Sequence, residues 1–168
     1  MASRSKTAPQ RRRLKTQMPK ATTWVLTSSP DNHTATRETG FTVIGLKERN
    51  RKRAERIEPG DRIVLYLTKE MTFGGSITVT GEMYEDRKKI WPGKPGNPDP
   101  YPWRFPTEPE VEIDPESHVP AEKLKDKMQH ILKWPVDHWK LAFQGQIREV
   151  SDADAKLLLK ELRAASRG

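Results

Sequence analysis

The chain has 168 residues and no cysteine, which predicts one domain without disulfide bonds, a zinc knuckle or a thiol nucleophile. Its longest apolar run, residues 63–67, is far too short to span a membrane, and the basic N-terminus lacks the apolar core of a secretory signal. We therefore expect a cytoplasmic protein.

The net charge of +8 is concentrated at the N-terminus. Residues 1–21 hold seven of the 31 Lys and Arg residues, including Arg11, Arg12 and Arg13, and no Asp or Glu. This segment has too little apolar surface to fold, so we predict a disordered basic tail before a domain at residues 22–168. The tail is either a basic arm on nucleic acid or a passive extension. The rest of the chain is nearly neutral, so polyanion binding depends on the tail and on local patches.

The domain opens with two predicted strands around a short helix. Residues 22–28 place apolar side chains on both faces, which predicts a strand. The turn-forming residues 29–32 are expected to end it. Residues 34–39 predict a short helix that ends at Gly40, and residues 41–45 predict a second strand.

A strongly basic segment follows at residues 47–56, where six Lys or Arg residues and two Glu lie within about three helical turns. Leu46, Ala54 and Ile57 can share one helical face, which predicts that this narrow face packs on a sheet. The basic side chains would then point to solvent. They either solubilise the surface or contact phosphates at the edge of a binding site.

The middle of the domain predicts a barrel. Pro59 and Gly60 suit a type II turn that leads into residues 62–68, whose apolar side chains on both faces predict a central barrel strand. Residues 73–75 (Phe-Gly-Gly) are expected to form a flexible loop that permits close approach. Residues 76–82 alternate in polarity and predict another strand.

Prolines dominate the next segment. Residues 92–109 contain seven of the fourteen prolines, which argues against a helix and against a regular central strand. A stiff segment loses little entropy on ordering, so we expect a fixed loop packed over the body and held by Tyr101 and Trp103. Val111 and Ile113 resume a period of two and predict a strand.

The C-terminal part predicts mainly helix. A helix beginning at Pro120 would carry one apolar stripe made of Leu124, Met128, Ile131 and Leu132. It is expected to end near Pro135, before a strand at residues 146–150 and a final helix capped by Ser151. About six short strands and three or four helices, without regular βαβ alternation, predict an α+β fold: a small mixed β-barrel with peripheral helices.

No pattern of catalytic or metal-binding residues stands out. The four histidines lack ligand spacing, and phosphate-cradling and nucleophile-elbow motifs are missing, so we expect no metal, no cofactor and no catalysis. The chain does offer cations that can bind phosphates, namely Lys47, Arg49, Arg51, Lys52 and Arg53. It also offers rings on which a base could stack: Trp24, Tyr66, Trp91, Tyr101, Trp103 and Phe143. Core packing is the favoured interpretation for Trp24 and Phe143, while Tyr66 and Trp91 stay open.

Several short motifs follow one another in a characteristic order. They are residues 24–30 (WVLTSSP), Gly45-x-Lys47-x-Arg49, Pro59-Gly60-Asp61, Gly74-Gly75-x-Ile77, Trp134-Pro135 and residues 141–145 (LAFQG). Together they resemble the EVE domain over about residues 22–162, in particular a stand-alone bacterial branch. The resemblance implies a PUA-like fold and a more distant likeness to YTH domains, which read methylated RNA bases through an aromatic cage.

The resemblance also implies a non-catalytic pocket for a modified or flipped base of RNA or DNA. Carried over to this sequence, the pocket residues are Trp24, Ser28, Ser29, Tyr66, Gly74, Gly75, Phe143 and Gln144. The basic segment would hold the flanking phosphates. Two other functions stay open: a hydrolase of acylated nucleosides that uses Lys47 with Glu48, and a protein-interaction module that uses the proline-rich loop. A monomer without a membrane partner is expected.

Overall fold

The computed structural model describes residues 21–93, 96 and 99–167. Arg11, Arg12 and Arg13 of the predicted basic tail lie outside these residues. The main strands are β1 (Thr23–Ser28), β2 (Val43–Leu46), β3 (Arg62–Leu67), β4 (Thr72–Val79), β6 (Trp103–Glu112) and β8 (Ile147–Val150), and the two-residue strands are β5 (Tyr84–Glu85) and β7 (Val119–Pro120). The helices are α2 (Pro30–Glu38), η3 (Glu48–Asn50), α3 (Arg51–Ala54), η4 (Pro115–Ser117), η5 (Ala121–Leu124), α4 (Gln129–Leu132), η6 (Val136–Phe143) and α5 (Asp152–Arg167).

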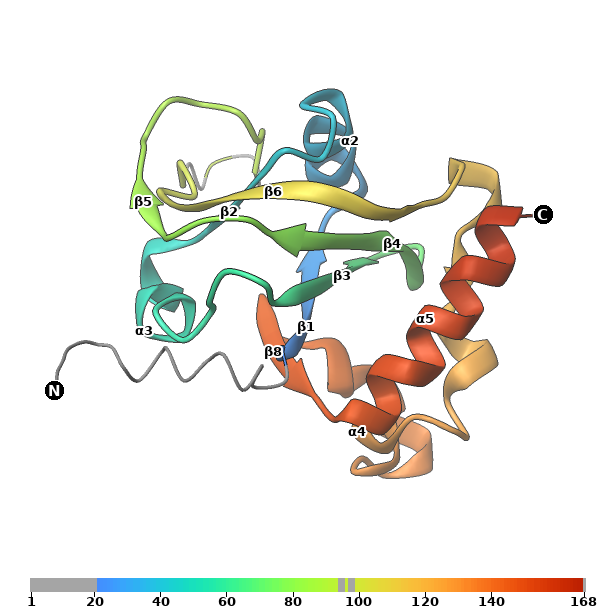
Figure 1. Ribbon diagram of the computed structural model, residues 1–168. Coiled ribbons are helices and arrows are strands. Elements are labelled where there is room, and N and C mark those ends of the chain that lie inside the picture. The colour runs from blue at the N-terminus through green and yellow to red at the C-terminus, as the bar shows by residue number, and fades with distance from the viewer. Residues whose placement is uncertain (1–20, 94–95, 97–98, 168) are drawn as a thin grey trace, which may run out of the picture.

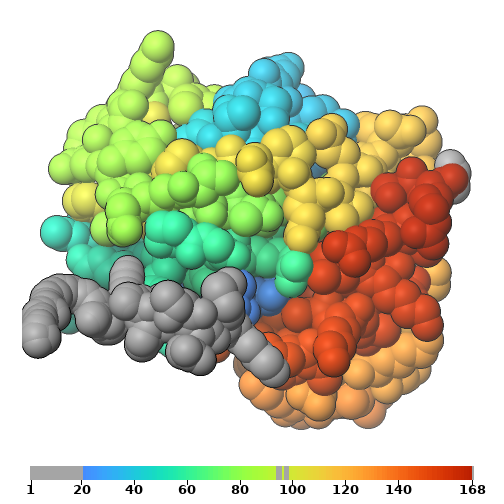
Figure 2. Space-filling view, viewed as in Figure 1, coloured from blue at the N-terminus to red at the C-terminus, as the bar shows by residue number. Residues whose placement is uncertain are grey.

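The strands form one curled sheet in the order β2-β6-β4-β3-β1-β8, with β5 beside β6 and β7 beside β4 (Figure 1). β1 and β3 run parallel, whereas the pairings of β8, β4, β6 and β2 along the path are antiparallel. α2 lies at one end of the sheet, and α5 crosses its flank together with the segment before it, as the red and orange surface in Figure 2 shows. The predicted α+β fold with a small mixed barrel and peripheral helices is therefore confirmed, and the barrel is a curled half-barrel.

β3 separates two apolar clusters, which confirms the prediction of a central strand covered on both faces. Ile63 and Leu65 point into one cluster, which includes Trp24, Ile44 and Phe105. Val64 and Tyr66 point into the other, which includes Phe73, Phe143, Leu158 and Leu162. Each fully buried leucine of α5 contributes about 1.5–3 kcal/mol, so this helix is fixed on the sheet by its apolar face.

α2 begins earlier than the sequence predicted. Residues 29–32 were expected to form a turn, but Ser29 is the N-cap, and its hydroxyl accepts the Asn32 N–H at 3.1 Å. Pro30 stands at the first helical position, where its missing N–H costs nothing. The predicted end is confirmed, since Gly40 has φ +78° in the left-handed region.

Residues 73–75 are part of β4, so the predicted flexible loop is wrong. The expectation of close approach does hold at Gly75, which has φ +131° and where a Cβ would lie 2.6 Å from the Val111 carbonyl oxygen. Glycine here lets β6 pair tightly with β4 while the strand continues.

β6 is a ten-residue strand, although its prolines had argued against a regular strand. Pro109 pairs with Ile77 at the register shift between Ser76 and Ile77, and a bulge tolerates a residue without N–H. Pro106 still contributes its carbonyl oxygen, which accepts the Thr80 N–H at 2.9 Å. The sheet therefore uses both prolines where no ladder donor is required.

The long helix predicted from Pro120 is wrong, because the segment breaks into β7, η5 and α4. Met128 is extended between the last two, with φ −80° and ψ 125°. The Asp154 carboxylate accepts the N–H groups of Gln129 and His130 at 2.8 and 2.9 Å, so it caps a new helix there. The apolar stripe is buried as expected except at Leu132, which is 58% exposed.

The basic segment forms two short turns, η3 and α3, in place of one helix. Its predicted packing face is confirmed, since Leu46, Ala54 and Ile57 are buried. None of the helices in the described ranges is long and apolar enough to cross a membrane. Nor do residues 21–93, 96 and 99–167 gather three or more side chains that could hold a metal ion.

Candidate functional site

The two end strands of the curled sheet, β2 and β8, are joined by side chains. The Gln146 Oε1 atom accepts the Lys47 backbone N–H at 2.9 Å and the Asn50 side-chain amide at 2.8 Å. The Arg53 guanidinium also donates to the Ile147 carbonyl oxygen at 3.2 Å. We call the five residues of these three hydrogen bonds the seam: Lys47, Asn50, Arg53, Gln146 and Ile147. The seam brings the basic segment next to the start of β8.

A cavity of about 590 Å³ lies beside the seam, large enough for a nucleobase or another small ring system. Segments far apart in the sequence line it: the end of β1, the start of α2, β2 and the residues after it, the proline-rich loop, and the residues before β8. Its polar, charged and aromatic lining comprises Thr27, Ser28, Ser29, Asn32, His33, Thr36, Lys47, Arg49, Thr68, Trp91, Tyr101, Phe143, Gln144 and Gln146.

Trp91 and Tyr101 form an aromatic wall of this cavity. Their ring centroids are 5.8 Å apart with an interplanar angle of 69°, and the Trp91 Nε1–H donates to the Thr36 hydroxyl at 2.8 Å. Gly45 of β2 gives this wall its space. A Cβ at Gly45 would lie 2.6 Å from the Tyr101 carbonyl oxygen and 2.7 Å from the Trp91 ring. The glycine therefore leaves room for the Trp91 ring and for the Tyr101 backbone.

A fully buried arginine, Arg104 of β6, holds the wall in place. Its guanidinium donates to the carbonyl oxygens of Tyr101 at 3.2 Å and Pro100 at 3.1 Å, and also to that of Lys88. It lies 5.1 Å from the centre of the Trp91 ring, a cation–π distance. Tyr101 adopts φ +52°, a left-handed conformation that is costly for a tyrosine. The contacts of Arg104 thus stabilise a strained backbone at the cavity.

Asn32 links α2 to the aromatic wall and to the proline-rich loop. Its Nδ2 amide donates to the Tyr101 hydroxyl at 3.0 Å, and its Oδ1 accepts the Gly93 N–H at 3.0 Å. Both ends of the proline-rich loop are therefore bonded to one side chain. This bonding makes the loop part of the cavity.

His33 follows Asn32 and is only 3% exposed, yet neither of its ring nitrogens has a hydrogen-bond partner among the described residues. Burial is the main reason that the pKa of His33 is lowered to about 4, and the neighbouring His118 and Arg37 lower it further. The ring is therefore neutral near pH 7. Gly74 makes room for it, because a Cβ there would lie 2.9 Å from the His33 Cε1 atom.

The predicted phosphate-binding residues fall into two groups. Lys47 and Arg49 line the cavity, and the exposed Arg49 has no hydrogen bond or ion pair within the described part of the chain. Arg51, Lys52 and Arg53 do not line it. Arg51 stacks 4.5 Å from the Trp103 ring and pairs with Glu55, while Arg53 belongs to the seam.

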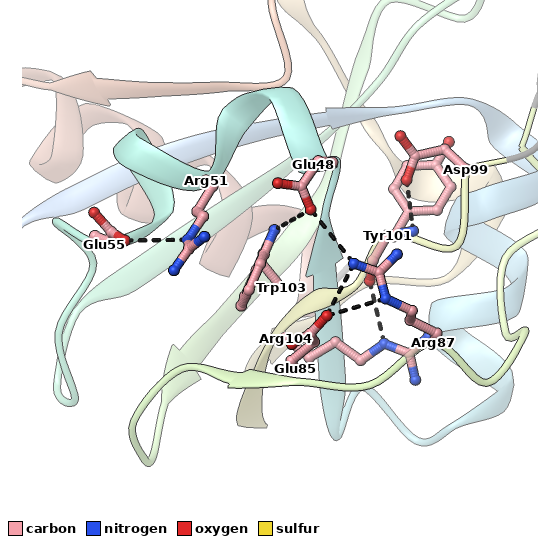
Figure 3. A network of polar contacts seen from close by, with 9 residues as sticks. All are labelled: Glu48, Arg51, Glu55, Glu85, Arg87, Asp99, Tyr101, Trp103 and Arg104. Carbon is pink, nitrogen blue, oxygen red and sulfur yellow. Dashed lines mark hydrogen bonds and ion pairs between the residues drawn. The ribbon is translucent and has the colours of Figure 1, made fainter.

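A surface network beside the basic segment fixes Glu48 (Figure 3). Its carboxylate accepts the Trp103 Nε1–H at 3.0 Å and lies 3.6 Å from Arg87, which also pairs with Glu85. Glu48 is not among the residues that line the cavity. The Lys47 and Glu48 side chains are therefore not assembled there as a catalytic pair.

Of the eight predicted pocket residues, Ser28, Ser29, Phe143 and Gln144 line the cavity, whereas Trp24, Tyr66, Gly74 and Gly75 do not. Trp24 lies in the core, where its Nε1–H donates to the Asp61 carboxylate at 3.0 Å. Tyr66 stacks on Phe143 with centroids 4.2 Å apart, and burial raises its pKa to about 12. Gly75 serves the pairing of β4 with β6, and Gly74 makes room for the His33 ring, as described above.

The sequence reasoning missed several residues of the site. Asn32 was assigned to a turn, and Gln146 to the edge of a strand, so neither was recognised as a cavity residue. Arg148 was also missed. Its Nε–H donates to the Gln144 carbonyl oxygen at 3.0 Å, which places a further cation beside the cavity. The LAFQGQ run was a usable signal, because its polar residues directly precede a strand.

The curled sheet with its flanking helices belongs to the PUA-like class of fold. Within that class the chain belongs to the EVE family, since the EVE domain model matches residues 22–161. The chain is also similar to the UPF0310 protein PH1033 of Pyrococcus horikoshii. The two are 24% identical over 151 residues, which cover 84% of this chain and 99% of the relative.

Several solved structures share the fold, and two of them were solved with nucleic acid. The YTH domain of Zygosaccharomyces rouxii MRB1, solved with N6-methyladenosine RNA, has a TM-score of 0.59 and 18% identity, and the match covers 85% of this chain and 87% of that one. Human THYN1, solved with DNA containing 5-methylcytosine, has a TM-score of 0.56 and 16% identity, with coverages of 83% and 96%. A hypothetical protein of Leishmania major has a TM-score of 0.58 and 14% identity, with coverages of 86% and 96%.

Proposed function

We propose that the protein is a non-catalytic nucleic-acid-binding module that takes a flipped or modified base into the cavity beside the seam. The observation that carries this proposal is a cavity of about 590 Å³ with an aromatic wall and with Lys47 and Arg49 in its lining. Ring stacking on Trp91 or Tyr101 is worth about 1–3 kcal/mol per base, comparable to the cost of unstacking it from a strand.

The cations suit the phosphates of the same strand. Arg49 is exposed and lines the cavity, so its guanidinium can meet a phosphate while the attached base lies inside. Arg148, which is hydrogen-bonded to the Gln144 carbonyl oxygen, can provide a second phosphate contact. Phosphate contacts position a strand without reading its sequence, so the base would be selected inside the cavity. The complexes of the YTH domain with N6-methyladenosine RNA and of THYN1 with 5-methylcytosine DNA support a nucleic-acid-binding function.

The test is equilibrium binding of short labelled RNA and DNA strands at several salt concentrations. The double variant Lys47→Ala/Arg49→Ala should bind more weakly. The slope of log K against log salt should be less steep by roughly 1–2 for this variant, since each phosphate contact contributes about 0.7–0.9 to the slope. The matched control is Lys156→Ala/Lys160→Ala on the exposed side of α5, which removes the same charge away from the cavity. Equal affinities and slopes for the two double variants would refute the phosphate role.

The hydrolase alternative is less favoured by the geometry. It requires Glu48 to work with Lys47, but Glu48 is bonded to Trp103 and close to Arg87 on the surface. Incubation with acylated nucleosides provides a direct check, because turnover would release acid. We expect no release above that of a heat-denatured sample.

The protein-interaction alternative would use the proline-rich loop as the contact surface for a partner. The loop also belongs to the cavity, because Trp91, Gly93 and Tyr101 line it and the Gly93 N–H donates to Asn32. Deleting residues 93–100 would therefore damage the cavity as well as the loop. Point variants of Trp91 and Tyr101, assayed with nucleic acid, separate the two functions better than a deletion.

A further inference from the structure

Two amide side chains in the cavity have a fixed orientation, because backbone N–H groups can only donate. The Gly93 N–H faces Asn32, so the atom that accepts it must be Oδ1. The Lys47 N–H faces Gln146, so the accepting atom there must be Oε1. In each side chain the NH₂ group therefore occupies the remaining position.

These orientations leave hydrogen-bond donors in excess. The Asn32 amide donates one of its two hydrogens to the Tyr101 hydroxyl, and the second hydrogen remains available to donate. Because the Tyr101 oxygen accepts that bond, its own O–H remains available to donate. The Gln146 NH₂ has no acceptor within the described ranges of the chain. The Trp91 N–H and the Thr36 O–H are already engaged, with Thr36 and Asn32 respectively.

The two best-placed donors are neighbours. The Asn32 Nδ2 atom and the Tyr101 hydroxyl oxygen are 3.0 Å apart, and both residues are more than 90% buried in the lining. Buried donors that find no acceptor are costly, so a ligand should supply acceptors at this point. The hydroxyls of Ser28 and Ser29 can donate or accept, so they do not oppose this preference.

We propose that the cavity selects a base with two adjacent hydrogen-bond acceptors, a proposal that rests on the nucleic-acid function above. Cytosine carries such a pair at N3 and O2, and guanine carries one at N7 and O6. Adenine and uracil or thymine instead alternate donors and acceptors along each edge. A substituent at cytosine C5 leaves both acceptors free, so the preference extends to bases modified there.

The test uses the full chain and strands that differ only in one central nucleotide, with C, 5-methyl-C, G, A and U or T as separate arms. We expect at least one of the C, 5-methyl-C and G strands to bind roughly tenfold or more tightly than the A and U or T strands. Equal or tighter binding of A or U would overturn the inference. The arms also separate cytosine from guanine.

The protein side of the test is Tyr101→Phe, which keeps the ring of the wall and removes only its hydroxyl donor. This variant should lose about fivefold or more in affinity for the preferred base and little for the others. Tyr84→Phe, at an exposed tyrosine of β5, is the matched control and should behave as the wild type. An unchanged base preference in Tyr101→Phe would contradict the donor role.

The outcomes distinguish this inference from the proposed function. If no strand binds at any salt concentration, the nucleic-acid function fails and the inference fails with it. If strands bind with the predicted effect of Lys47 and Arg49 but without base preference, only the inference fails. The base series on the wild-type chain needs no variant to fold, so it decides the question alone.

Discussion

Replacing Arg104 by Met tests whether this buried arginine holds the aromatic wall. Arg104 is 1% exposed, and its guanidinium satisfies the carbonyl oxygens of Tyr101, Pro100 and Lys88. Methionine fills a similar volume but donates no hydrogen bond. Three carbonyls would lose their donor, at about 1 kcal/mol each, with part of the loss offset by removing a buried charge. We expect the free energy of unfolding to fall by about 1–3 kcal/mol.

The same change should weaken nucleic-acid binding, because Trp91 and the strained Tyr101 would no longer be fixed. We expect at least a tenfold loss of affinity at a temperature where circular dichroism shows the variant to be folded. Urea titration measures the free energy of unfolding, and fluorescence anisotropy of a labelled strand measures the affinity.

Arg87→Met is the control. Arg87 lies near the same loop, but its side chain is 55% exposed and its ion pairs with Glu48 and Glu85 are on the surface. Such pairs are worth about 0–1 kcal/mol, so this variant should lose little stability and no affinity. If Arg104→Met were no more harmful than Arg87→Met in both assays, the reasoning about the wall would be refuted.

Three further substitutions probe the cavity and its seam. Gly45→Ala should destabilise the fold by about 1–3 kcal/mol in urea titration and weaken binding, because its Cβ would press on Trp91 and Tyr101. Gln146→Leu should lower stability by a similar amount, since it leaves the Lys47 N–H at the seam without an acceptor. His33 is protonated more readily in the unfolded chain, so it should reduce stability by up to about 3 kcal/mol as the pH falls from 6.5 to about 4. His33→Phe should remove that share of the pH dependence, and an unchanged pH profile would contradict its burial as a neutral ring.

Local signals in the sequence were enough to predict the sheet's centre. The apolar residues of β3, such as Ile63 and Val64, are buried on opposite faces, as their pattern indicated. The cap at Ser151 and the left-handed Gly40 also marked real helix ends. These features depend on side chains within a few residues of one another, so the sequence displays them directly.

The errors arose where distant residues decide the local structure. Asp154 caps α4 from 24 residues away in the sequence, and this contact ends the helix that the apolar stripe had predicted. Pro109 is tolerated in β6 because of an irregularity in its neighbour β4. Pro30 was treated as part of a turn although it suits the first position of a helix.

The site could be predicted in part for the same reason. Lys47, Arg49, Ser28 and Gln144 belong to compact motifs, and they line the cavity. Trp91 and Tyr101 were recognised as rings on which a base could stack, but their place in the cavity could not be predicted, because Arg104 and Asn32 hold Tyr101 there through contacts between distant residues. Trp24 belongs to one of the family motifs, but its indole N–H is bonded to the Asp61 carboxylate in the core. No local pattern in the sequence indicates this contact.

The central claim is that a base enters the cavity beside the seam. Photo-crosslinking tests it most directly, using a strand with 5-iodocytosine at its central position and mass spectrometry of the labelled peptides. The account predicts that the covalent bond maps to Trp91, Tyr101 or Phe143 and that excess unlabelled strand competes it away. Crosslinks that map only to residues outside the cavity lining, such as Trp139 or Tyr84, would contradict the account.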